Sequence, residues 1–128
     1  MKTYYAVGSG MLVGAVMGAA AVQSLHAQSK PPAYVISEID VTNPDAYEKE
    51  FVPLANKALA ESGQKRLASG GKTISLAGAP PASRVVVSVF ETLEKAQAAY
   101  TSPAYIEARK IGDKHGRLRI FAVEGIAP

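Results

Sequence analysis

The apolar positions of this chain change their spacing several times, and each change predicts a different element. Three stretches are rich in β-branched side chains, as is typical of strands; they are residues 34–41 (YVISEIDV), 84–90 (RVVVSVF) and 117–124 (RLRIFAVE). A fourth extended stretch, 65–76, is interrupted by Gly70 and Gly71. Paired glycines inside a strand pattern indicate a bulge or a close approach of another group to the backbone. The pattern therefore predicts four strands.

Helical spacing follows the first strand. Asn43 is suited to cap a helix and Pro44 to occupy its first position. A stripe with helical periodicity then runs to Gly63; it consists of Tyr47, Phe51, Leu54, Ala55 and Ala58. Pro53 lies within this stripe and cannot donate the backbone hydrogen bond of a regular helix. We therefore expect one helix with a kink or a break at Pro53.

A second helical region follows the third strand. Thr92 is the expected cap of a helix that ends at Tyr100, and Ser102-Pro103 repeats the cap-and-proline signal. The restarted helix is expected to end at about Ile111, which leaves residues 112–116 as a charged loop between two glycines. The element order is thus β-α-β-β-α-β.

This order predicts an α+β fold of the ferredoxin-like type, with a four-stranded antiparallel sheet and helices on one face. The third strand is largely apolar on both faces, since Val85, Val87 and Val89 fill one face and Val86, Ser88 and Phe90 fill the other. Helices on one side can cover only one of these faces. We expect a second copy of the sheet to cover the other, which makes the protein a homodimer of the dimeric α+β barrel type.

Residues 1–27 have the pattern of a signal peptide: Lys2, then an apolar run over 6–22, then a small residue at Ala27. The alternative is an uncleaved membrane anchor, because the run is at the lower edge of a membrane-spanning length. Residues 28–32 form a linker, and 33–125 the folded domain. The domain is expected to be periplasmic or secreted, or else anchored to the inner membrane and facing the periplasm.

Composition excludes several functions. The chain has no cysteine, so disulfides, thiolate catalysis and iron–sulfur clusters are excluded. Lys2 is the only charged residue before Lys30, and without the leader 13 basic residues (14 minus one) face 11 acidic ones. A charge of +2 is too small to predict nucleic acid as a partner. No metal and no cofactor is expected.

Four segments in order resemble a known family: residues 33–51, the Gly70-Gly71 pair, the Tyr-x-Ser-Pro-x-Tyr core within 98–109, and the closing 123–125. The chain resembles the family called domain of unknown function thirteen-thirty, which is grouped with the dimeric α+β barrel proteins. The resemblance implies the fold and a dimer. It implies no activity, although related barrel families include cofactor-free monooxygenases, lactone isomerases and haem-dependent enzymes.

Three residues are candidates for acid–base chemistry. Glu38 and Asp40 share one face of the first strand, and in an enclosed barrel interior the pKa of each carboxyl would rise. They could instead be hydrated or paired with Arg66, Arg84 or Arg119. His115 is the only histidine after the leader, and imidazole is a general base near neutral pH. A solvated loop histidine is the alternative.

Tyr100, Tyr105 and Arg109 form a candidate ligand-binding group. Tyr105 and Arg109 are four residues apart, so they share a helix face and could hold an anionic or aromatic ligand. Tyrosines at helical spacing are otherwise typical of a core.

Three functions remain open at this stage. The first is binding of a small organic molecule in the barrel interior of a homodimer. The second is a cofactor-independent oxygenase or isomerase that uses Glu38, Asp40 or His115. The third is a non-enzymatic envelope interaction or stress protein.

Overall fold

Strand β1 (Ala33–Val41) lies inside the sheet, between β3 (Arg84–Phe90) and β4 (Gly116–Glu124), and β2 (Lys65–Ser69) pairs with the outer side of β3. All three pairings are antiparallel. A computed structural model describes residues 30–128, so the predicted leader at 1–27 lies outside the described residues. The order β2-β3-β1-β4 confirms the ferredoxin-like topology.

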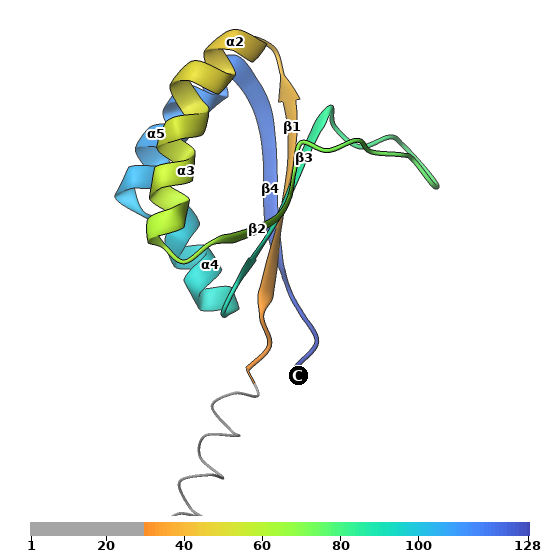
Figure 1. The fold of residues 1–128 in the computed structure, drawn as a ribbon, viewed down its shortest axis with the longest axis vertical. Coiled ribbons are helices and arrows are strands. Elements are labelled where there is room, and N and C mark those ends of the chain that lie inside the picture. The colour runs from red at the N-terminus through yellow and green to blue at the C-terminus, as the bar shows by residue number, and fades with distance from the viewer. Residues whose placement is uncertain (1–29) are drawn as a thin grey trace, which may run out of the picture. The chain divides into compact units, whose positions relative to one another are not determined.

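The helices form one layer against one face of this sheet (Figure 1). They are α2 (Pro44–Ala46), the π-helix η1 (Tyr47–Phe51), α3 (Val52–Glu61), α4 (Leu93–Tyr100) and α5 (Pro103–His115). The three predicted caps are confirmed, because Asn43, Thr92 and Ser102 each accept a hydrogen bond from a backbone N–H three residues later, at 3.2–3.3 Å. No helix of residues 30–128 is long and apolar enough to cross a membrane.

Pro53 does not break the first helix. The chain remains helical from α2 to α3, and the π-helical turn η1 comes immediately before the proline, with the Val52 N–H donating to the Tyr47 carbonyl. Since Pro53 has no N–H and its ring crowds the carbonyl four residues earlier, a wider turn accommodates it within the helix. The predicted irregularity is therefore present as a π turn.

The strand predicted over 65–76 is too long. Strand β2 ends at Ser69, and residues 70–83 form an exposed segment without regular structure that projects from the sheet away from the helices (Figure 1). The ladder irregularity lies between Arg66 and Ala68, earlier than the glycine pair. Gly70 adopts a φ of +72°, which favours glycine and turns the chain out of the strand.

The loop predicted at residues 112–116 is also wrong. Helix α5 continues to His115, and β4 begins directly at Gly116. Gly112 lies inside the helix because α5 packs closely on η1: a Cβ at this position would lie 2.7 Å from two ring carbons of Phe51. The glycine therefore reflects close packing and not a helix end.

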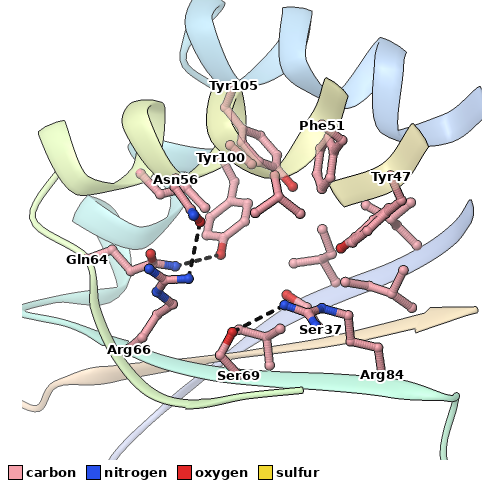
Figure 2. A pocket seen from close by; sticks show the side chains of 17 residues that line it. Ser37, Tyr47, Phe51, Asn56, Gln64, Arg66, Ser69, Arg84, Tyr100 and Tyr105 are labelled. Atoms are coloured by element: carbon pink, nitrogen blue, oxygen red, sulfur yellow. Dashed lines mark hydrogen bonds between the residues drawn. The ribbon is translucent and has the colours of Figure 1, made fainter. Parts of the chain in front are cut away.

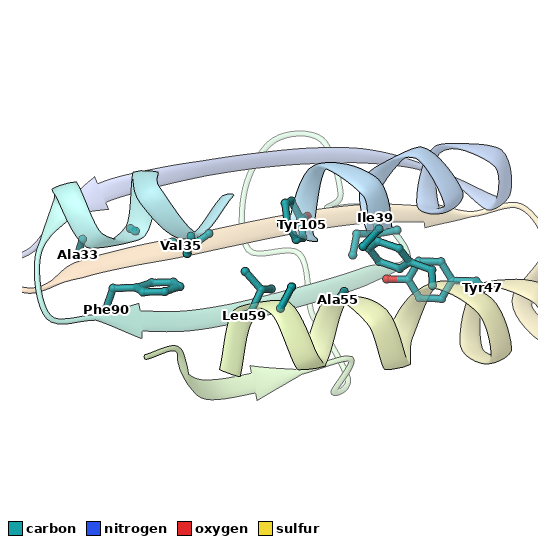
Figure 3. Close-up of a cluster of buried hydrophobic side chains, with 13 residues drawn as sticks. Ala33, Val35, Ile39, Tyr47, Ala55, Leu59, Phe90 and Tyr105 are labelled. Atoms are coloured by element: carbon teal, nitrogen blue, oxygen red, sulfur yellow. The ribbon is translucent and has the colours of Figure 1, made fainter. Parts of the chain in front are cut away.

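The two faces of β1 have different surroundings. Val35 and Ile39 face the helices and are buried in the core (Figure 3). Ser37, which lies between them on the same face of the strand, is buried as well. The opposite side of the sheet, which we call the open face, has no cover among residues 30–128 and contains a continuous apolar patch. Its members, aligned by the strand register, are Tyr34, Ile36, Val85, Val87, Val89, Phe121 and Val123.

Candidate functional site

A cavity of about 50 Å³ lies between the helix layer and the sheet (Figure 2). Polar side chains from β2, β3, η1, α4 and α5 converge on it within an otherwise apolar lining. We call it the Arg84 pocket and define it by Tyr47, Arg66, Ser69, Arg84, Tyr100 and Tyr105. A cavity walled mainly by apolar and aromatic groups, with a few convergent polar ones, is the usual form of a small-molecule site.

Arg84 reaches the pocket because of strand alternation. It is the first residue of β3 and shares the helix-facing side with Val86, Ser88 and Phe90, which oppose the buried positions of β1. A long, charged side chain therefore enters a space that the same pattern keeps apolar elsewhere.

Three neighbours fix the Arg84 guanidinium. Its Nη2 donates to Ser69 Oγ at 3.3 Å, and its Cζ lies 5.8 Å from the centroid of the Tyr47 ring. Nη1 lies against the backbone of Gly70, where a Cβ would be only 2.4 Å away. The nearest carboxylate, Glu48, is 3.9 Å from Nη1 and more than half exposed. Nε is buried and has no hydrogen-bond partner among residues 30–128.

Tyrosine rings form the opposite wall. Tyr100 and Tyr105 meet edge to face with ring centroids 4.7 Å apart, and Tyr105 is only 3% exposed. Burial raises the pKa of the Tyr105 phenol far above its usual value, and the nearby Tyr100 adds to this increase. Burial also raises the pKa of Tyr100, against the opposing effect of the Ser88 and Ser37 hydroxyls and the Gln64 amide. For Tyr47, burial raises the pKa and the Arg84 guanidinium opposes the increase.

Two polar contacts connect the helix layer to the segment that contains Gln64 and strand β2, and all four residues line the pocket. Arg66 Nη1 donates to Asn56 Oδ1 at 3.2 Å, and Gln64 Nε2 donates to the Tyr100 hydroxyl at 3.4 Å (Figure 2). These contacts join the edge strand to the helix layer.

The described lining of the pocket contains few groups that could transfer a proton at neutral pH. None of its described lining residues is Asp, Glu or His. Its three phenols hold their protons at neutral pH, because the pKa of each lies above its ordinary value near 10. Guanidinium and phenol groups thus offer positive charge and hydrogen-bond donors to a ligand.

The carboxylates singled out from the sequence lie elsewhere. Glu38 is on the open face, where its Oε2 accepts from Arg119 Nη1 at 3.0 Å and its Oε1 from the Ala82 N–H at 3.4 Å. Asp40 Oδ1 accepts from the Ser83 N–H at 3.3 Å. The arrangement contains the Arg119 pairing that the sequence offered as the alternative, and neither carboxylate lines the Arg84 pocket.

His115 ends helix α5, and its Nε2 lies 3.0 Å from Glu50 Oε2. Its backbone carbonyl accepts hydrogen bonds from the N–H groups of Thr42 and Asn43, which ties the end of α5 to the start of the first helix. The side chain is 17% exposed, so it is not a solvated loop histidine. It does not line the Arg84 pocket.

The structure brings together two of the three proposed ligand-binding residues. Tyr100 and Tyr105 both line the pocket, whereas Arg109 does not. The Arg109 side chain turns along its helix, with Nε donating to Asp113 Oδ1 at 2.9 Å and Nη2 to the Leu118 carbonyl at 3.5 Å. Tyr105 and Arg109 are one helical turn apart, but only Tyr105 lines the pocket.

Sequence reasoning missed Arg84, Ser69 and Tyr47 as site residues. Two signals were available. Arg84 lies an even number of residues before the buried Ser88 and Phe90, so it points to the same face of β3. In addition, Ser37 interrupts an apolar face of β1. Polar residues at buried strand positions require partners and often mark a site. Ser69 gave no such signal, because its contact with Arg84 depends on the strand pairing.

The fold defines a ferredoxin-like α+β protein with a pocket between its layers. The family model described as Domain of unknown function (DUF1330) matches residues 32–126, and the chain belongs to this family. No curated protein matches the chain.

Solved structures show the same fold at low sequence identity. The RPA0582 protein of unknown function from Rhodopseudomonas palustris is 14% identical, with a TM-score of 0.60 over 77% of this chain and 85% of that one. SnoaB, a cofactor-independent oxygenase from Streptomyces nogalater, is 13% identical, with a TM-score of 0.53 over 73% of this chain and 91% of that one. A conserved protein of unknown function and possible oxidoreductase from Bacteroides thetaiotaomicron is 13% identical, with a TM-score of 0.50 over 74% of this chain and 98% of that one.

Proposed function

We propose that this domain binds a small, partly apolar organic molecule in the Arg84 pocket. The observation that carries the proposal is the convergence of Arg84, Tyr100 and Tyr105 on the lining of one cavity, where the Arg84 Nε atom is buried without a hydrogen-bond partner among residues 30–128. The sequence suggested a ligand between two paired sheets. The convergent polar groups instead favour the helix-covered side of a single sheet, so each subunit would hold its own ligand.

The size of the cavity limits the ligand. About 50 Å³ suffices for a few water molecules or for part of a one-ring compound, with the remainder lying toward the α3–β2 edge. Edge-to-face tyrosines favour a flat molecule, because aromatic groups pack best against other planar groups.

The proposal includes a homodimer formed through the open face. The apolar patch there includes Phe121 and Val123, which are 42% and 50% exposed in the single chain. The 70–83 segment projects from this side and carries Ile74 and Leu76, at 71% and 87% exposure (Figure 1). Burying such surface is the usual driving force for association. The signal-peptide pattern in the sequence of residues 1–27 supports the further proposal that the domain is periplasmic or secreted, or else anchored to the inner membrane and facing the periplasm.

Two matched serine substitutions test the binding proposal. Ser69→Phe fills the pocket at the β2 edge, whereas Ser75→Phe adds the same ring to the exposed segment outside it. Saturation-transfer NMR with benzoate, benzamide and benzyl alcohol should detect binding of at least one of them to the wild type and to Ser75→Phe, and its loss in Ser69→Phe. Absence of binding by all three, or equal binding to both variants, would refute the proposal.

A cofactor-independent oxygenase is the second candidate, because SnoaB has the same fold and that activity. Glu38, Asp40 and His115 all lie outside the pocket, so a substrate bound there would need to be acidic in its own right. Oxygen-electrode measurements with a one-ring phenol or hydroquinone and no added cofactor test this candidate. Oxygen consumption that Ser69→Phe abolishes would support an oxygenase. If the wild type consumes no oxygen with these compounds, only the binding proposal is left.

A further inference from the structure

The Nε–H group of Arg84, which has no hydrogen-bond partner among residues 30–128, indicates which class of ligand suits the pocket. The inference that follows rests on the proposed function. We infer that the Arg84 pocket selects a small planar carboxylate, with the carboxylate on the Arg84 guanidinium and the flat apolar body against the tyrosine wall.

The first step is the charge balance of the pocket. Its lining contains two guanidinium groups, those of Arg66 and Arg84, and no Asp or Glu. Glu48 approaches Arg84 only to 3.9 Å and keeps 59% of its side chain exposed, so water weakens its compensating effect. A partly buried cation without a close counter-ion stabilises an anionic ligand.

The second step is the count of hydrogen bonds. A guanidinium has five N–H groups and no acceptor. Nη2 of Arg84 donates to Ser69, and Nη1 lies between Gly70 and Glu48. The Tyr47 hydroxyl also interacts with the guanidinium, because a hydrogen bond with Arg84 opposes the rise in the pKa of Tyr47. Nε is buried and has no partner among residues 30–128. Leaving such a donor unsatisfied is costly, and a carboxylate oxygen satisfies it with a charge-assisted bond.

The third step is shape. Ser69, Gly70 and the Tyr47 ring hold the guanidinium from three sides, so its planar edge is oriented before any ligand arrives. Parallel N–H groups on that edge match the two oxygens of a carboxylate. The tyrosine pair across the cavity favours a flat body next to the carboxylate (Figure 2).

Isothermal titration of the full chain with benzoate and with benzamide tests the inference, because the two probes share a shape and differ in charge. Benzoate should bind at least about tenfold more tightly than benzamide, the increment expected of a charge-assisted hydrogen bond. Arg84→Gln should remove this difference by weakening benzoate alone, and Arg84→Lys should restore only part of it. The control Arg117→Gln, which removes the same charge from the opposite face of the sheet, should leave both affinities unchanged.

The outcomes separate the two proposals. Equal or tighter binding of benzamide to the wild type, abolished by Ser69→Phe, would leave the pocket as a ligand site and refute the carboxylate inference. Failure of both probes to bind would refute this inference, and failure of benzyl alcohol as well would refute the proposed function. If Arg84→Gln does not fold, the benzoate and benzamide affinities of the wild type alone decide whether the pocket prefers a carboxylate.

Discussion

Gly70 and Arg84 fit together as backbone and side chain: the Arg84 Nη1 atom occupies the space that a Cβ on residue 70 would need, 2.4 Å away. Gly70 also donates its N–H to the Val85 carbonyl at 2.9 Å, so the turn that ends β2 is bonded to the strand that carries Arg84. The glycine thus ends a strand and orients a guanidinium at once.

Gly70→Ala should therefore weaken benzoate binding as well as stability. Gly78→Ala is the matched control, because Gly78 has nearly the same φ (+74° against +72°) and nothing lies within 4 Å of its Cβ position. Each substitution should cost about 1 kcal/mol of unfolding free energy from backbone strain, measured by urea titration. Only Gly70→Ala should also displace Arg84 and reduce benzoate affinity. Equal benzoate affinities in the two variants would contradict this role.

Gly112→Ala should destabilise the domain although alanine is the better helix former. The added methyl group would lie 2.7 Å from the Phe51 ring. Overpacking of this kind costs about 1–3 kcal/mol, against a gain in helix propensity of about 1 kcal/mol. The thermal midpoint should fall, and Phe51→Leu should lose less stability in the Gly112→Ala background than in the wild type. An increase in the midpoint of Gly112→Ala would show that α5 does not pack closely on Phe51.

Stability should decline in alkaline solution because of the buried phenols. Burial raises the pKa of Tyr47, Tyr100 and Tyr105 above 10.0, so the folded state keeps these protons at pH values where the unfolded chain loses them. Their contribution is complete below about pH 10 and is lost as the pH rises beyond it. Urea titrations between pH 8 and pH 11 should show this decline, and Tyr105→Phe should reduce its slope.

Phe90→Leu serves as the control for this pH experiment. It disturbs the same core, where Phe90 contacts the Tyr100 ring at 6.0 Å between centroids, but removes no phenol. The alkaline slope of Phe90→Leu should therefore equal that of the wild type. A slope that Tyr105→Phe leaves unchanged would exclude Tyr105 as a source of the decline.

Phe121→Glu should convert the proposed homodimer into a monomer, because it places a carboxylate within the apolar patch on the open face. Ile106→Glu is the matched control: Ile106 is similarly exposed, at 46% against 42%, but lies on α5 in the helix layer. Sedimentation velocity should give a dimer for the wild type and for Ile106→Glu. A monomeric wild type, or a dimeric Phe121→Glu, would contradict assembly through this face.

Much of the fold was predictable because local signals agreed with one another. The β-branched runs placed β1, β3 and β4 to within one residue, and Asn43, Thr92 and Ser102 cap helices as expected. The errors occurred at glycines, whose local meaning is ambiguous. The local pattern predicts a helix end at Gly112, but this glycine accommodates the ring of Phe51, which lies 61 positions earlier in the chain and outside any local pattern.

The candidate site was predictable only in part. Tyr100 and Tyr105 were correctly placed near each other, since both belong to the Tyr-x-Ser-Pro-x-Tyr core. Arg109 was grouped with them by helical spacing, but it pairs with Asp113 instead. For Arg84 the sequence predicts only a possible ion pair with Glu38 or Asp40. Its role depends on Ser69, Gly70 and Tyr47 together, and three strand and helix pairings bring these residues into contact.

The most direct test of the account is the NMR signal of the Arg84 Nε–H group itself, in the ¹⁵N-labelled full chain. Its cross-peak can be assigned by its absence from Arg84→Gln. The account predicts that this peak shifts progressively as benzoate is added, reaches a plateau, and responds far less to benzamide. An Arg84 Nε–H signal that benzoate leaves in place, while other signals of the protein report binding, would contradict the central claim that Arg84 anchors the ligand.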